Sequence, residues 1–77
     1  MAEVKIYTTP SCGYCAMAKK FFKDRGIDYT EINVAADAQE REKMIKKTGQ
    51  MGVPVIEIGK ETIIGFDKKK ISELLGI

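Results

Sequence analysis

The sequence contains no histidine and no tryptophan, and it has only two cysteines and two prolines among 77 residues. Without histidine, the chain cannot build the Cys–His pair of a thiol hydrolase. Two cysteines cannot close a structural zinc site, which needs four ligands, although two chains could pool their cysteines around one ion. The net charge of +2 is too small to indicate a nucleic-acid-binding protein.

Long apolar runs are also missing. No stretch approaches the roughly 20 apolar residues of a membrane span, and the first residues, MAEVKIYTT, lack the apolar core of a signal peptide. We therefore expect a protein of the reducing cytoplasm with no membrane partner. A single disulfide closing a very short loop would be a poor structural staple, because it removes little entropy from the unfolded chain.

What remains is an alternation of strand and helix patterns in one domain, residues 1–77. The predicted strands are Glu3–Thr8, Asp28–Val34, Val53–Ile58 and Glu61–Ile64, and the predicted helices are Tyr14–Arg25, Asp37–Thr48 and Lys68–Leu75. The order is βαβ followed by ββα, so a right-handed crossover makes the first two strands parallel. A hairpin turn at Gly59-Lys60 adds an antiparallel pair. We expect an α/β fold, a four-stranded mixed sheet flanked by three helices.

Apolar spacing predicts which faces of the helices meet the sheet. In the first helix Cys15, Ala18 and Phe22 share one stripe, and Met17 lies beside it. In the last helix the residues expected to face inward include Leu74. Cys15 is therefore expected to be buried.

Both cysteines fall in the stretch TTPSCGYC, where the first strand gives way to the first helix. The start of a helix offers free N–H groups and a partial positive charge, which favour the thiolate of Cys12, the form that attacks disulfides. Lys19 and Lys20 on the same helix add to this positive field. Cys15 lies one turn further on, near Cys12 but shielded from solvent. The pattern predicts a two-step exchange in which Cys12 forms a mixed disulfide and Cys15 then releases the reduced substrate.

Two further stretches are candidates for holding a substrate. In GQMGVPV, a cis peptide between Val53 and Pro54 would present the Val53 backbone to an extended peptide, whereas an edge-strand proline is the simpler interpretation. In IIGFDKKK, Gly65 permits a tight turn and Asp67 caps the last helix. The lysines that follow are either a solvated surface or a rim that attracts a carboxylate to exposed N–H groups.

With YTTPSCGYC near its start, VP before the third strand and GFD before the last helix, the sequence resembles the glutaredoxins over essentially its whole length. It is most similar to short glutaredoxin-like proteins, which resemble the glutaredoxin-like electron donors of ribonucleotide reductase. The resemblance implies a thioredoxin fold, with Cys12 as the nucleophile and Cys15 as the resolving thiol. It also implies that protein disulfides are substrates and that glutathione is a co-substrate, with no permanently bound cofactor or metal. Nothing in the sequence demands more than a monomer.

The resemblance also implies a glutathione site. The matching residues are Tyr14, Arg41, Val53, Pro54, Gly65, Phe66 and Asp67. Three positions depart from the family pattern: Thr9 replaces a lysine, Lys68 replaces an acidic residue, and Ile64-Gly65 replaces a pair of glycines. Each lost or opposed charged contact is worth about 1–3 kcal/mol when partly desolvated. The departures favour weak glutathione binding.

Two alternatives to a glutathione-dependent reductase stay open. The Gly-Phe turn resembles that of the ribonucleotide reductase donors, which take electrons from thioredoxin reductase, whereas CGYC resembles true glutaredoxins. The glycine after the first cysteine resembles the residue found there in some glutaredoxins that carry an iron–sulfur cluster between two chains and two glutathiones. The first alternative changes the electron source, and the second makes the chain a binding module.

Overall fold

The computed structural model describes residues 3–49, 52 and 54–77. Their elements follow the order β1 (Val4–Thr8), α1 (Gly13–Asp24), β2 (Thr30–Asn33), α2 (Ala38–Thr48), β3 (Val55–Ile58), β4 (Glu61–Ile64) and α3 (Lys68–Leu75). The strands within these residues form one four-stranded sheet in the order β2-β1-β3-β4. β1 is parallel to β2 and antiparallel to β3, and β3 is antiparallel to β4. The predicted mixed sheet with its helices is confirmed.

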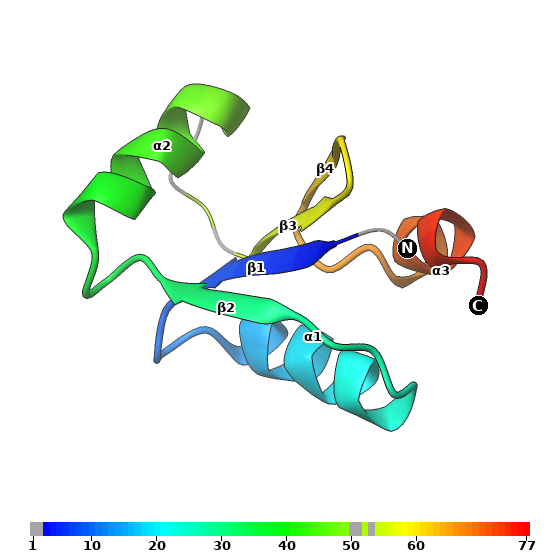
Figure 1. The fold of residues 1–77 in the computed structure, drawn as a ribbon. Helices are drawn as coiled ribbons and strands as arrows, with labels where there is room; N and C mark the ends of the chain where they lie inside the picture. The colour runs from blue at the N-terminus through cyan, green and yellow to red at the C-terminus, as the bar shows by residue number, and fades with distance from the viewer. Residues whose placement is uncertain (1–2, 50–51, 53) are drawn as a thin grey trace.

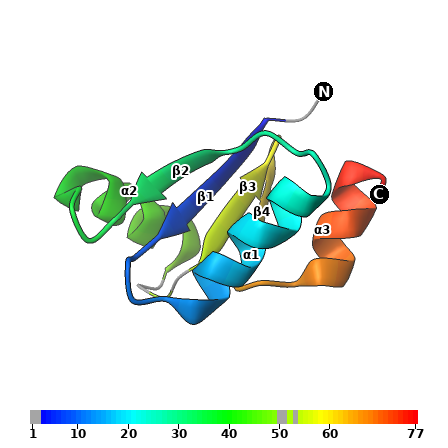
Figure 2. The ribbon, with the colours of Figure 1, turned by 90° about the horizontal axis from the view of Figure 1, so that it is seen from below.

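The helices divide between the two faces of the sheet. Figures 1 and 2 show α2 over one face and α1 over the other, with α3 beside α1. The apolar cluster under α1 and α3 has the buried members Val4, Ile6, Ala18, Phe21, Phe22, Ile56, Ile58, Ile63 and Ile71. The cluster under α2 consists of Tyr7, Val34, Met44 and Val55. Ile6 and Tyr7 are neighbours in β1 and point to opposite faces, as the alternation of a strand requires.

Side-chain caps begin the helices. Asp37 accepts the N–H of Glu40 at 3.1 Å at the start of α2, and Asp67 accepts the N–H of Lys70 at 3.2 Å at the start of α3. Such caps satisfy N–H groups that have no partner inside the helix. α1, α2 and α3 have 12, 11 and 8 residues. Among the described residues, no helix is long and apolar enough to cross a membrane.

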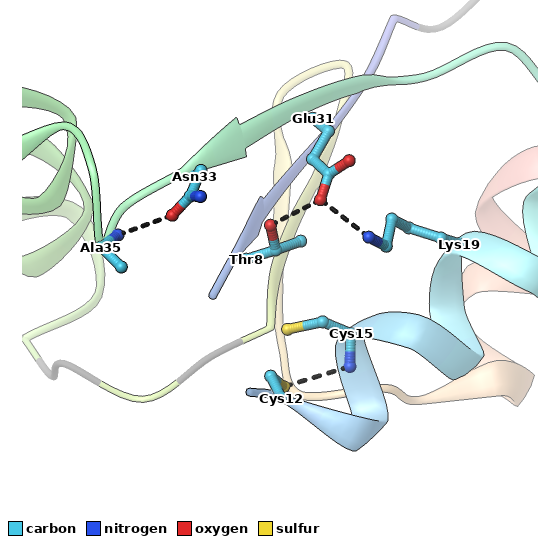
Figure 3. Close-up of polar contacts among 7 residues, drawn as sticks. All are labelled: Thr8, Cys12, Cys15, Lys19, Glu31, Asn33 and Ala35. Atoms are coloured by element: carbon cyan, nitrogen blue, oxygen red, sulfur yellow. Dashed lines mark hydrogen bonds and ion pairs between the residues drawn. The ribbon is translucent and has the colours of Figure 1, made fainter. Parts of the chain in front are cut away.

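β2 is shorter than the predicted strand Asp28–Val34. Its pairing with β1 begins at Thr30, opposite Lys5. The strand ends at Asn33 because the side-chain oxygen of Asn33 accepts the N–H of Ala35 at 2.9 Å (Figure 3). An asparagine that bonds the backbone two residues on forms a turn, and this turn replaces the last residue of the expected strand.

Two apolar side chains, one predicted to lie beside the buried stripe of α1 and one predicted to face inward from α3, are exposed. Met17 is 53% exposed and Leu74 is 36% exposed. Met17 lies one turn before Phe21, whose ring is covered by Phe66 at 5.9 Å between ring centroids and by the Arg25 guanidinium at 5.3 Å. Phe66 and the residue that caps the end of α1 therefore cover the turn that carries Phe21, and Met17, one turn earlier, stays at the surface.

Replacing Phe22 tests how much α1 packing contributes to stability. Phe22 is fully buried, and its ring meets those of Phe21 and Tyr29 at centroid distances of 6.0 and 5.5 Å. Phe22→Ala should cost about 3–5 kcal/mol, close to the whole stability of so small a domain. Phe22→Leu should cost about 1–2 kcal/mol and stay folded. Urea unfolding followed by circular dichroism measures both, with the exposed Met17→Ala as the control. If Phe22→Leu were as stable as Met17→Ala, this would contradict the prediction that the buried Phe22 ring stabilises the fold.

Candidate active site

Both cysteines lie where the loop after β1 enters α1. Cys12 donates its N–H to the Thr9 carbonyl at 3.2 Å, which closes a turn before the helix. Cys12 has extended backbone angles, φ −88° and ψ 111°, and is the N-cap residue of α1. The helix therefore begins at Gly13, one residue before the predicted Tyr14. Cys12 is partly exposed, whereas Cys15 is 1% exposed.

The two cysteines interact directly at the helix start. The N–H of Cys15 points at the sulfur of Cys12, with 3.1 Å between nitrogen and Sγ (Figure 3). A backbone N–H aimed at a sulfur favours negative charge there, as does the positive end of the helix dipole. The structure thus places Cys12 at the start of the helix, as the sequence predicts.

Cys15 has the opposite environment. Its side chain lies in the buried stripe of α1, and burial is the main cause that raises the pKa of its thiol to about 12. A side-chain hydrogen bond with Cys12 raises the pKa further, while a backbone hydrogen bond from Thr9 and the charge of Lys19 lower it. At neutral pH Cys15 is a protonated thiol. The site therefore pairs an accessible sulfur with a protected one.

Beside the cysteines lies a polar cluster formed by Thr8, Glu31 and Lys19. The Thr8 hydroxyl donates to Glu31 Oε2 at 2.8 Å, and Lys19 Nζ pairs with the same oxygen at 2.9 Å (Figure 3). These two hydrogen bonds lower the pKa of the Glu31 carboxyl, and the bond to Glu31 raises the pKa of Lys19. The sequence pattern does not predict this cluster. Its only signal was the spacing of Lys19 four residues after Cys15, and the partner comes from a distant strand.

The structure brings two of the predicted binding segments together. Gly65 donates its N–H to the Pro54 carbonyl at 2.8 Å. Gly65 has φ +85°, a conformation that other residues rarely adopt, so the turn depends on glycine here. The pairing of Tyr7 with Val55 sets the buried Pro54 beside the end of β1, next to the loop of Cys12.

Pro54 lies just before β3, which begins at Val55 rather than at the predicted residue Val53. Proline has no N–H to contribute to the ladder between β1 and β3. Val53 lies outside the described residues, and so does the predicted cis peptide between Val53 and Pro54.

The other predicted binding residues differ in their surroundings. Tyr14 is 65% exposed on the first turn of α1, beside Cys12. Phe66 is half-buried against the ring of Phe21, and Asp67 caps α3. Arg41 is exposed on α2, across the sheet from the helix that carries the cysteines. The contacts that the structure gives for Arg41 do not join it to the other predicted residues.

The structure also shows where Thr9 and Lys68, two of the departures from the family pattern, lie. Thr9 lies in the turn before Cys12, and Lys68 is the first residue of α3. The Lys68 ammonium lies 5.6 Å from the centre of the Phe21 ring, a favourable contact of a cation with an aromatic face. In the described part of the chain, no three His, Cys, Asp or Glu side chains gather where they could hold a metal ion.

A thioredoxin-like sheet with two cysteines at the start of α1 is the arrangement of a thiol–disulfide oxidoreductase. The sequence model of the Glutaredoxin family matches residues 4–63. An uncharacterized glutaredoxin-like 8.6 kDa protein in the rubredoxin operon of Clostridium pasteurianum is 44% identical over 72 residues, 94% of this chain and 96% of that protein. Glutaredoxin 3 of Escherichia coli is 40% identical over 67 residues, 87% of this chain and 81% of that protein. The chain belongs to the glutaredoxin family of thiol–disulfide oxidoreductases.

Solved structures of relatives superpose on the fold. The glutaredoxin of Archaeoglobus fulgidus has a TM-score of 0.86 at 29% identity, covering 97% of this chain and 87% of that one. NrdH-redoxin of E. coli, a glutaredoxin-like protein with a thioredoxin-like activity profile, has a TM-score of 0.82 at 28% identity, with coverages of 94% and 93%. Buckwheat glutaredoxin, solved in complex with glutathione, has a TM-score of 0.77 at 27% identity, with coverages of 97% and 71%.

The raised pKa of Cys15 predicts how its reactivity depends on pH. In a Cys12→Ser variant, the rate of Cys15 alkylation by iodoacetamide should rise about tenfold per pH unit up to about pH 10, because only the thiolate reacts. Burial, the main cause of the shift, is retained in this variant. The same variant unfolded in urea is the control, and its rate should level off above the ordinary cysteine pKa of about 8.5. A plateau near pH 9 in the folded protein would contradict the prediction.

Proposed function

We propose that the chain reduces protein disulfides and glutathione mixed disulfides, with Cys12 as the nucleophile and Cys15 as the resolving thiol. The observation that carries this proposal is the asymmetry between the two sulfurs. Cys12 is partly exposed at the helix start and accepts an N–H from Cys15 at 3.1 Å, whereas Cys15 is 1% exposed one turn away. An attacking thiol needs access and negative charge, and a resolving thiol needs closeness to the first sulfur and protection from other reactants.

The proposed reaction proceeds in two exchanges. The Cys12 thiolate attacks one sulfur of the substrate disulfide, and the other sulfur leaves and takes up a proton. Cys15 then loses its proton and attacks the Cys12 sulfur. The bond between Cys12 and the substrate breaks, a bond between Cys12 and Cys15 forms, and the proton lost by Cys15 balances the one gained by the departing thiol. Two electrons pass from the dithiol to the substrate, and a thiol reductant must restore them.

Among the predicted substrate residues, Pro54 and Gly65 support this proposal by their place near the Cys12 loop. The hydrogen bond from Gly65 to Pro54 ties the turn before α3 to the start of β3, and the β1 pairing brings Pro54 beside the Cys12 loop. We place an extended substrate, such as a peptide or glutathione, along this end of the sheet, with Tyr14 beside the reacting sulfurs. Its far end would meet Phe66 and the start of α3 at Asp67.

Glutathione is the proposed electron source, in common with the family. Glutaredoxin 3 is among the relatives, and buckwheat glutaredoxin was solved with glutathione bound. Lys68 opposes this ligand, because it sets a positive charge where the resemblance implies an acidic partner for the glutathione ammonium. We therefore propose weak glutathione binding in a monomer of the reducing cytoplasm. Thioredoxin reductase is the second candidate, favoured by Lys68 and by the likeness to NrdH-redoxin with its thioredoxin-like activity profile.

Serine variants test the roles of the two cysteines. Cys12→Ser should lower disulfide reduction to background, because serine keeps the helix cap but is not a nucleophile at neutral pH. Cys15→Ser should stop the reduction of protein disulfides and accumulate a mixed disulfide at Cys12, visible by mass spectrometry. It should spare the reduction of glutathione mixed disulfides, in which a second glutathione completes the exchange. Full activity in Cys12→Ser would exclude the proposed mechanism.

Parallel assays of NADPH oxidation identify the electron source. One assay supplies glutathione with glutathione reductase, and the other supplies thioredoxin reductase alone, with the same disulfide substrate. Turnover with glutathione is expected. Lys68→Asp should lower the apparent KM for glutathione about tenfold, as one charged contact of about 1.4 kcal/mol implies, whereas Lys69→Asp, the same charge change one position on, should have little effect. Turnover with thioredoxin reductase alone would instead support the second candidate.

A further inference from the structure

Three polar side chains from three separate elements meet beside the resolving cysteine. Thr8 ends β1 and is 2% exposed, Glu31 lies in β2, and Lys19 lies in α1. The hydroxyl of Thr8 and the ammonium of Lys19 both bond Oε2 of Glu31, at 2.8 and 2.9 Å. In Figure 3 the side chains of Cys15 and Lys19 both leave α1 toward the sheet, and Thr8 and Lys19 lie between the Glu31 carboxylate and the cysteines. Lys19 is also close enough for its charge to lower the pKa of Cys15.

The resolving step creates an electrostatic problem at this place. Cys15 must become a thiolate to attack Cys12, yet burial favours its neutral form. A positive charge nearby lowers the cost of that ionisation. Lys19 follows Cys15 by four residues on the same helix, so the two side chains lie on one face.

Other groups also act on the members of this cluster. Besides Lys19, which lowers the pKa of Cys15, Cys12 raises that pKa and a hydrogen bond with the backbone of Thr9 lowers it. Tyr29 raises the pKa of Lys19, and the charge of Lys23 lowers the pKa of Glu31.

The pair of Glu31 and Lys19 stays ionised around neutral pH. The hydrogen bonds from Lys19 and Thr8 lower the pKa of the Glu31 carboxyl, so Glu31 is a poor proton acceptor. The bond to Glu31 raises the pKa of Lys19, so Lys19 keeps its proton. The cluster is thus suited to holding a fixed charge and not to carrying a proton.

We propose that the Lys19 ammonium stabilises the negative charge on the Cys15 sulfur while Cys15 resolves the mixed disulfide. Glu31 and Thr8 are positioning residues, which hold an otherwise flexible lysine chain toward the sheet. The inference rests on the proposed function, in which Cys15 attacks the Cys12 sulfur and its proton balances the one gained by the departing thiol. The lysine neither gives nor takes a proton in this step.

The test separates the two exchanges in one experiment. In stopped flow, the aromatic disulfide dithiobis(nitrobenzoate) releases one coloured thiolate when Cys12 attacks and a second when Cys15 resolves. Lys19→Gln should slow the second release about threefold between pH 6 and 9 and leave the first unchanged. The slowing follows because a higher Cys15 pKa leaves less thiolate at each pH, and the greater nucleophilicity of that thiolate offsets only part of the loss.

Three further variants isolate the cause. Lys46→Gln removes the same charge from an exposed site on α2 and should behave like the parent. Lys19→Arg keeps the charge and should restore the second release. Glu31→Gln keeps an oxygen for Thr8 and Lys19 but removes the negative charge, so it should resolve no more slowly than the parent. A purely structural role for Lys19 would change both releases together.

Two outcomes would overturn the proposal. A second release in Lys19→Gln as fast as in the parent would show that Lys19 does not act on Cys15. A slowing in Lys19→Arg equal to that in Lys19→Gln would show that the positive charge is not the cause. Failure of the proposed function has a different signature, because the parent chain itself would then give no second release.

Discussion

The stripe formed by Cys15, Ala18 and Phe22 packs α1 against the sheet, and this contact determines the different properties of the two cysteines. With that face of the helix buried, Cys15 is shielded from solvent, and burial raises its pKa. The same orientation leaves Cys12 at the helix start, where an N–H from Cys15 points at its sulfur. A rotation of α1 by one residue would move both sulfurs, because neighbouring positions on a helix differ by about 100°. The chemistry therefore depends on ordinary core packing.

The end of β1 collects the rest of the site. Thr8 ends the strand, the Cys12 loop follows it, and antiparallel pairing sets Pro54 alongside. Gly65 reaches the same place through its bond to the Pro54 carbonyl, which ties the turn before α3 to this end of the sheet. Residues far apart in the sequence thus share one end of the sheet, whereas the α2 cluster of Tyr7, Val34, Met44 and Val55 supports the opposite face. The hydrogen bonds that join these segments reduce the freedom that a bound peptide would otherwise have to remove.

Local patterns in the sequence were sufficient to predict the order of strands and helices, because apolar spacing, caps and glycine stops act over a few residues. They were also sufficient to place Cys12 at a helix start and Cys15 in a buried stripe. They failed at Met17, since its exposure depends on where other elements cover α1, and at the end of β2, where the Asn33 turn prevailed over strand propensity. The pairing of Lys19 with Glu31 could not be predicted, because it depends on how the β1–β2 pair and α1 meet in space. The same lysine had been expected to add to the field at Cys12.

The burial of Cys15 also bears on oxidative damage. Stepwise oxidation of sulfur by peroxide attacks exposed thiolates first, and its later stages are irreversible. Cys15 is both protonated and enclosed, so oxidants in solution meet Cys12. A sulfenic acid formed on Cys12 would lie one helical turn from the unoxidised thiol of Cys15. Condensation of the two to a disulfide would stop the oxidation at a stage that a thiol reductant can reverse. The packing that makes Cys15 a slow nucleophile thus also preserves it as the partner that repairs Cys12.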